Sequence, residues 1–114
     1  MAARNYTLTT RARSRARKER FDDLDTALAT LERRGQELQA DAHERPVGGA
    51  LIRRLEPVQI VVARLELAGP GRLRAGVDVR GDGSSEAYTG RLRRLVLEQR
   101  DGESAYDALR RAVA

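Results

Sequence analysis

Apolar residues recur at alternating steps of three and four between positions 21 and 38, which is the period of one face of an α-helix. This seam consists of Phe21, Leu24, Leu28, Leu31, Gly35 and Leu38. The pattern predicts a long helix over residues 14–42, with Ser14 as a candidate cap; a loop before Arg20 is the alternative. The seam covers fewer heptads than a coiled coil requires, which favours packing against the protein's own sheet over a coiled-coil partner.

A two-residue alternation of apolar and polar positions predicts strands elsewhere in the chain. Residues 5–10 are rich in β-branched side chains and predict a short first strand. Residues 58–67 and 72–80 alternate more clearly, and the Gly-Pro-Gly turn between them predicts an antiparallel pair. One face of this pair is expected to be buried and the other open.

The last part of the chain predicts a hairpin and a closing helix. An Asp-Gly turn at residues 81–85 leads into a further strand within residues 86–99. The alternation slips along this strand, which predicts a bulge at Arg93-Arg94. Residues 102–113 then predict a short helix with apolar residues on one side.

Together these elements predict an α+β fold in a single domain, residues 1–114. The order is strand, long helix, three antiparallel strands and short helix, which predicts a two-layer sandwich with both helices on one sheet face. Residues 58–99 form the three-stranded hairpin core of the antiparallel sheet, and the short N-terminal strand joins it. Residues 43–57, with a proline and paired glycines, are interpreted as a linker.

The composition narrows the possible classes of protein. The chain has 114 residues, of which 40% are apolar and only 4% aromatic, so an aliphatic core is expected. It has no cysteine, which excludes disulfides, thiolate metal sites and a cysteine nucleophile. No apolar run approaches the length of a membrane span and no secretory signal is recognisable, so a cytoplasmic location is expected.

Positive charge is concentrated at the N-terminus. The formal net charge is +5, and residues 1–20 hold seven cations and one glutamate, whereas the rest of the chain is nearly balanced. This basic N-terminal segment favours polyanionic partners such as nucleic acid, and guanidinium groups suit bidentate phosphate contacts. An arginine-rich genomic composition would produce the same bias without any function.

The first functional hypothesis is a nucleic-acid- or ribosome-binding module that contacts phosphates by charge without reading sequence. Its predicted contact residues lie in the basic segment and on the sheet face expected to be open: Arg11, Arg13, Arg15, Arg17, Lys18, Arg20, Arg72, Arg74, Arg91 and Arg93. Tyr6 and Tyr88 are the only rings expected to be exposed, so little base stacking is predicted.

The alternative hypothesis is a homodimeric interaction or structural module. Its interface is expected either at Ile60 and Val62, which form an apolar corner of the predicted open face, or on the apolar seam of the long helix. Catalysis is not expected, because the sequence has one histidine, His43, and no pattern of nucleophile and base, paired carboxylates, metal ligands or phosphate loop. No cofactor, metal or small-molecule substrate is therefore predicted.

Overall fold

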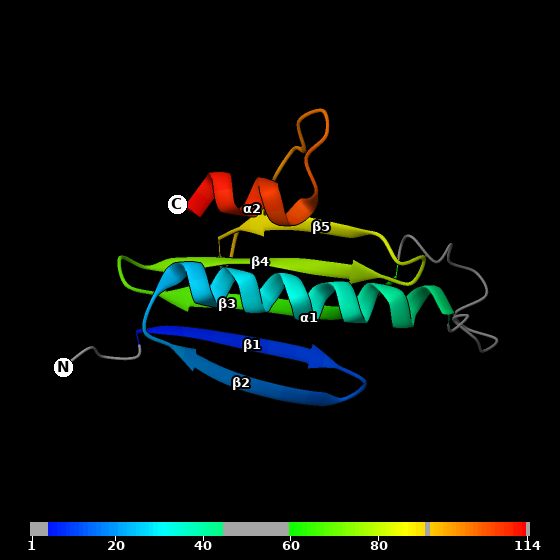
Figure 1. Cartoon of the computed structure of the whole chain (residues 1–114), viewed down its shortest axis with the longest axis horizontal. Helices are drawn as coiled ribbons and strands as arrows, with labels where there is room; N and C mark the ends of the chain where they lie inside the picture. Colours follow the sequence, from blue (N-terminus) through cyan, green and yellow to red (C-terminus); the bar gives the residue numbers. More distant parts are fainter. Residues whose placement is uncertain (1–4, 45–59, 91, 114) are drawn as a thin grey trace.

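The computed structural model describes residues 5–44, 60–90 and 92–113. These residues form one antiparallel sheet of six strands with two helices packed on one of its faces (Figure 1). The strands are β1 (Tyr6–Ala12), β2 (Arg15–Phe21), β3 (Val61–Gly69), β4 (Leu73–Arg80), β5 (Ser85–Thr89) and β6 (Leu95–Val96), and the helices are α1 (Leu24–Glu44) and α2 (Ala105–Val113). Across the sheet the order is β2-β1-β3-β4-β5-β6. The predicted α+β class, with an antiparallel sheet and two helices, is confirmed.

The core lies between the helix layer and one face of the sheet. Helix α1 contacts β1, β3 and β4, whereas α2 contacts β4 and β5. Leu65 and Val77 lie directly opposite one another on β3 and β4 and are fully buried. Leu28 and Leu31 of α1 reach the same core, and each buried leucine stabilises the fold by roughly 1.5–3 kcal/mol. The apolar seam predicted for the long helix covers the sheet from Leu24 onwards, whereas its first predicted member, Phe21, packs against the core from β2.

The two helices meet at the glycine of α1. A Cβ atom on Gly35 would overlap the hydroxyl group of Tyr106 in α2, so the absence of a side chain lets the tyrosine ring lie against α1. The Tyr106 hydroxyl donates a hydrogen bond to the Gln39 side chain, and Glu32 forms an ion pair with Arg110 at 2.6 Å. The helix layer is therefore held together by one ring and two polar contacts.

Residues 15–21 form a strand instead of the first turns of the predicted long helix. β2 pairs antiparallel with β1, and the two turn residues between them, Arg13 and Ser14, have positive φ angles of 51° and 64°. Helix α1 begins after Asp23, whose carboxylate accepts a hydrogen bond from the Thr26 N–H at 2.8 Å. The prediction of a helix starting at Ser14 was wrong, because residues 14–20 contain a single apolar residue, Ala16, and so have no helical apolar period.

The charged residues themselves follow the period of a strand. Arg11, Arg13, Arg15 and Arg17 occupy every second position, whereas a helix face recurs every third or fourth residue. β2 lies at the edge of the sheet, where charged side chains are common because they discourage pairing with other chains. Such a strand needs no apolar face of its own, so hydrophobic periodicity could not reveal it.

The strand predicted within residues 86–99 is broken into two. β5 ends at Thr89, and Gly90, with a φ angle of +96°, begins a turn that brings β6 back antiparallel to β5. A Cβ atom on Gly90 would overlap the Arg93 carbonyl oxygen, so this turn requires glycine. The predicted bulge at Arg93-Arg94 is instead part of a hairpin turn.

Helix α2 begins at Ala105, three residues after the predicted start. The Ser104 hydroxyl oxygen accepts a hydrogen bond from the Asp107 N–H at 3.1 Å, and the Asp107 carboxylate accepts one from the Ser104 N–H at 3.0 Å. This reciprocal cap satisfies two backbone donors and fixes the start of the helix. The predicted linker covers residues 43–57. Its first two residues end helix α1, and the remainder lies outside the described residues.

Candidate polyanion-binding surface

The sheet face turned away from the helices, called the open face below, carries a line of three cations on the β1–β2 hairpin. Lys18 and Arg20 lie two residues apart on β2, and Arg11 of β1 lies opposite Ala16. Residues two apart on a strand share a face and are separated by roughly 7 Å, so the three cations follow the hairpin at similar intervals. All three are exposed, and none forms an ion pair with a described residue.

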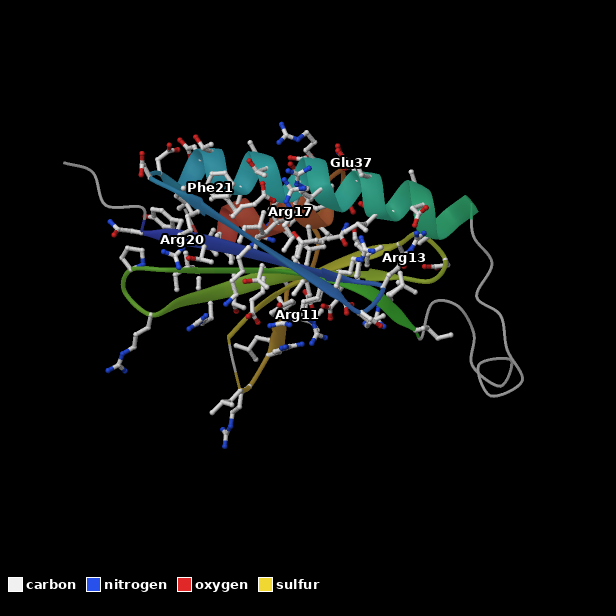
Figure 2. All side chains as sticks on the ribbon, turned by 90° about the horizontal axis from the view of Figure 1, so that it is seen from below. Arg11, Arg13, Arg17, Arg20, Phe21 and Glu37 are labelled. Carbon is white, nitrogen blue, oxygen red and sulfur yellow. The ribbon has the colours of Figure 1, made fainter. Side chains whose placement is uncertain are left out.

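The other arginines of the hairpin, Arg13, Arg15 and Arg17, lie in the turn or on the side of α1. Arg13 forms an ion pair with Asp41 of α1, and Arg17 lies 3.7 Å from Glu19 on its own strand. Figure 2 shows this division, because Arg17 lies between β2 and α1 whereas Arg11 points to the opposite side of the sheet. The alternation of β2 therefore separates a cluster that is continuous in sequence onto two faces, and the protein's own carboxylates neutralise part of it.

Glu19 connects β2 to the helix layer. Its two carboxylate oxygens accept hydrogen bonds from Nε and Nη2 of Arg34 at 3.0 Å each. The hydrogen bond from Arg34 is the main reason why the pKa of Glu19 is lowered, and the same bond raises the pKa of Arg34. Their side chains are only 18% and 21% exposed. This ion pair fixes the strand so that Lys18 and Arg20 face away from α1.

A shallow depression of about 540 Å³ lies at the tip of the β1–β2 hairpin. Four arginines from β1, the turn, β2 and β3 line it, namely Arg11, Arg13, Arg15 and Arg64. Arg15 is exposed and pairs with no described carboxylate, whereas Arg64 donates to Asp78 at 2.6 and 3.1 Å. The structure thus brings three of the predicted contact residues together with Arg64, which the sequence-based list of contact residues did not include.

The centre of the open face is occupied by Tyr88, which lies over Gly76 on the neighbouring strand. A Cβ atom on Gly76 would lie 2.6 Å from the Tyr88 hydroxyl oxygen, so the ring needs a glycine beneath it. The guanidinium carbons of Arg64 and Arg94 lie 5.9 and 4.8 Å from the ring centroid. Burial is the main reason why the pKa of Tyr88 is raised to about 12. The ring is only 2% exposed, so the exposure expected for it was wrong.

The other predicted contact residues are dispersed. Arg74 of β4 lies on the open face in the same cross-strand row as Arg20 and is half-buried. Arg72 and Arg93 are exposed in the β3–β4 and β5–β6 turns. Arg91 lies outside the described residues. Within the described part of this group, Arg74 alone joins the open face.

The predicted interface residues do not form an exposed apolar corner. Ile60 is half-buried, and Val62 is partly buried against the core. The register between β3 and β4 shifts between Val61 and Ala63, so the alternation assumed for β3 does not hold at its start. Val61 is the exposed residue at this end of the strand. The expectation for Ile60 and Val62 was therefore wrong, because this irregularity is not visible in the sequence pattern.

Other kinds of site are not apparent in the described part of the chain. No group of three or more metal-ligating side chains is found there. None of the described helices combines the length and apolar character needed to cross a lipid bilayer. Comparison with known proteins finds no matching family model, no matching curated protein and no matching solved structure. The function is therefore inferred from the surfaces of this chain alone.

Proposed function

We propose that the open face of the β1–β2 hairpin binds the phosphate backbone of nucleic acid, either free or within a ribosome. The observation that supports this proposal is the line formed by Arg11, Lys18 and Arg20, which are exposed and pair with no described carboxylate. Their spacing of roughly 7 Å along the strand direction is comparable to the distance between neighbouring phosphates on one nucleic-acid strand.

The arrangement of the charges favours phosphate binding over simple protection of a sheet edge. Charged residues of either sign, on either face, keep an edge strand from pairing with other chains. On the side of α1, β2 does carry both signs, because Arg17 lies beside Glu19. On the open face the exposed charges of the hairpin are all positive. A stretch of a single sign favours a polyanionic ligand, and the neighbouring carboxylate on this face, Glu66, lies on β3 outside the hairpin.

Binding of this kind is expected to be insensitive to nucleotide sequence. Contacts to phosphates position a protein but carry no base information. Tyr88, the one ring on the open face among the described residues, is covered and therefore offers no free surface for base stacking. Affinity should instead fall steeply with salt, because each phosphate contact releases counterions. In this proposal the protein is a non-enzymatic binding module.

The proposal is tested with two triple variants that remove the same charge. One carries Arg11→Ser, Lys18→Ser and Arg20→Ser on the open face. The matched control carries Arg13→Ser, Arg15→Ser and Arg17→Ser, of which the first and last are paired with the protein's own carboxylates. Fluorescence anisotropy with labelled single-stranded and duplex DNA and RNA measures affinity at several salt concentrations, and circular dichroism confirms that each variant is folded.

We expect the open-face variant to lose at least tenfold in affinity, and the slope of log K against log salt to become shallower by roughly 2 to 3. The control variant should lose less than about threefold, because Arg13 and Arg17 are already paired and release few counterions on binding, and Arg15 lies on the α1 side of the sheet, opposite Ala12. Equal losses in both variants would mean that net charge alone drives retention. Failure of the unmodified protein to bind any of the four probes would leave these cations as edge protection and overturn the proposal.

A further inference from the structure

Exposed apolar side chains are concentrated on the β5–β6 hairpin, at the end of the sheet opposite the basic segment. Leu92, Leu95 and Val96 are 95%, 68% and 58% exposed, and the remaining large exposed apolar residue of the described chain, Val61, is 39% exposed. Such a concentration of exposed apolar area on a small protein is typical of an interaction site. Because β6 is the outermost strand, this apolar area coincides with a free sheet edge.

The backbone of β6 presents unpaired hydrogen-bonding groups on its outer side. The Leu97 N–H donates to the Ala87 carbonyl of β5 at 2.9 Å and so points into the sheet. Since successive residues of a strand point their backbone groups to alternate sides, the N–H and carbonyl of Val96 point outward. The next residue whose backbone groups point outward is Glu98, and its carbonyl oxygen already accepts a hydrogen bond from Arg111 of the same chain at 2.9 Å. Val96 is therefore the point at which another strand can pair.

We propose that two copies of this chain associate by antiparallel pairing of β6 with β6, around a twofold axis at Val96. In this register the Val96 residues of the two copies exchange two backbone hydrogen bonds. Leu95 then lies opposite Leu97 of the second copy, and Leu97 already packs against the core in its own chain. The pairing buries exposed apolar side chains of the hairpin and satisfies the outward backbone groups of its free edge.

The sequence around β6 is complementary to itself in this register. Antiparallel pairing centred on Val96 places Arg94 opposite Glu98 of the second copy, and the twofold axis produces this ion pair twice. Moving the centre to Leu97 would place Arg94 opposite Arg100, which is repulsive. Moving it to Leu95 would place Arg94 opposite Val96, where its charge has no partner. Charge complementarity therefore selects one register.

The opposite edge of the sheet is unsuited to the same role. Five of the seven residues of β2 are charged, and Glu19 is already held by Arg34. Pairing through β6 with the twofold axis perpendicular to the sheet keeps all four helices on one side. The two cationic hairpins would then lie at the far edges of one continuous sheet, facing the same way. The dimer does not depend on nucleic-acid binding, and its test contains no nucleic acid.

Sedimentation velocity on the full chain over a range of protein concentrations tests the proposal. We expect a dimer with a dissociation constant in the micromolar range. Val96→Pro removes the outward N–H, and proline is tolerated at an edge position whose N–H faces solvent, so this variant should fold and sediment as a monomer. Circular dichroism and urea unfolding verify that it does fold.

The charge pair provides a second, independent test. Glu98→Arg places like charges opposite each other twice and should weaken the dimer roughly tenfold. Adding Arg94→Glu to that variant restores opposite charges and should recover most of the lost affinity, the remainder reflecting the loss of the Arg94 contact with the Tyr88 ring. Asp101→Arg changes the net charge equally outside the pairing register and should leave it unchanged. A monomeric unmodified protein, or a dimer indifferent to both Val96→Pro and Glu98→Arg, would overturn the proposal.

Discussion

The two edges of the sheet differ in how they limit pairing with other chains. β2 is seven residues long, and its exposed backbone is bordered by charged side chains. β6 is two residues long and carries exposed apolar side chains instead. A long free edge needs protection against pairing with other chains, whereas a short edge can be left open at lower risk of aggregation. This difference is the basis for proposing a nucleic-acid ligand at the hairpin that contains β2 and a second copy of the chain at β6.

The two edges also differ in how they are attached to the rest of the molecule. β2 is held from the helix side by the ion pair between Glu19 and Arg34. The β5–β6 hairpin is held from the open face, where Arg94 lies over the Tyr88 ring and the ring lies over Gly76. Changes to these supports should therefore affect one edge and spare the other, which makes the comparison testable.

The largest effect is expected from Gly76→Ala beneath Tyr88. The added methyl group would overlap the Leu65 carbonyl oxygen and lie 2.8 Å from a ring carbon of Tyr88. Because the first neighbour is backbone in a central strand, the site cannot relax freely, and we expect a loss of about 2–3 kcal/mol in the free energy of unfolding. Urea unfolding followed by circular dichroism measures it. A loss below about 0.5 kcal/mol would show that the strand can shift.

Tyr88→Phe serves as the control for this change. The Tyr88 hydroxyl is buried and has no hydrogen-bond partner among the described residues. Removing a buried unpaired hydroxyl while keeping the ring should leave stability unchanged or slightly increased. A clear loss of stability in Tyr88→Phe would indicate that the hydroxyl has a partner, and the packing argument for Gly76 would then need revision.

A smaller effect is expected from Arg34→Met at the support of β2. Methionine keeps an unbranched apolar chain against the helix but leaves the shielded Glu19 carboxylate with only its longer contact to Arg17, at 3.7 Å. We expect a loss of about 1–2 kcal/mol in the free energy of unfolding, with a rise in the pKa of Glu19 that NMR titration can follow. Arg33→Met, at an exposed neighbouring position of α1, should change stability by less than about 0.5 kcal/mol.

The smallest effect at neutral pH is expected from Glu103→Gln, on the segment that follows β6. Glu103 accepts hydrogen bonds from Arg111 and from the Arg100 N–H, which lower its pKa from 4.5 to about 2. A lowered pKa stabilises the folded state above pH 4.5, and this contribution is lost as the pH falls towards 2. As the pH falls from 4.5 to about 2, the free energy of unfolding of Glu103→Gln should therefore decrease less steeply than that of the unmodified protein. Identical acid unfolding curves for both proteins would contradict this.

Burial determined which elements could be predicted from the sequence. Leu28 and Leu31 of α1, and Val77 of β4, face the core, so their spacing reports the helix or strand period directly. β2 has one apolar residue that packs against the core, Phe21 at its end, and the rest of the strand carries no apolar alternation. The turn before it contains Arg13 and Ser14, neither of which is a usual residue for positive φ angles. Edge strands of this kind leave little trace in hydrophobic patterns.

The candidate site was predictable in composition but not in geometry. The sequence identifies Arg11, Lys18 and Arg20 as cations close together in the chain, yet their facing follows only from the strand pairing. The neutralisation of Arg13 depends on Asp41, which lies 28 positions further along the sequence. Contacts over such separations arise from the fold and have no local signature. The same holds for the covering of the Tyr88 ring.

The position of Tyr88 gives the protein an optical reporter of its own. The chain has no tryptophan and three tyrosines, so its ultraviolet emission arises from a few phenol rings. One of these rings lies directly beneath the guanidinium group of Arg94, in the turn that leads into β6. Any partner that displaces this arginine changes the polarity around the ring, and the emission of the unlabelled protein would record the event.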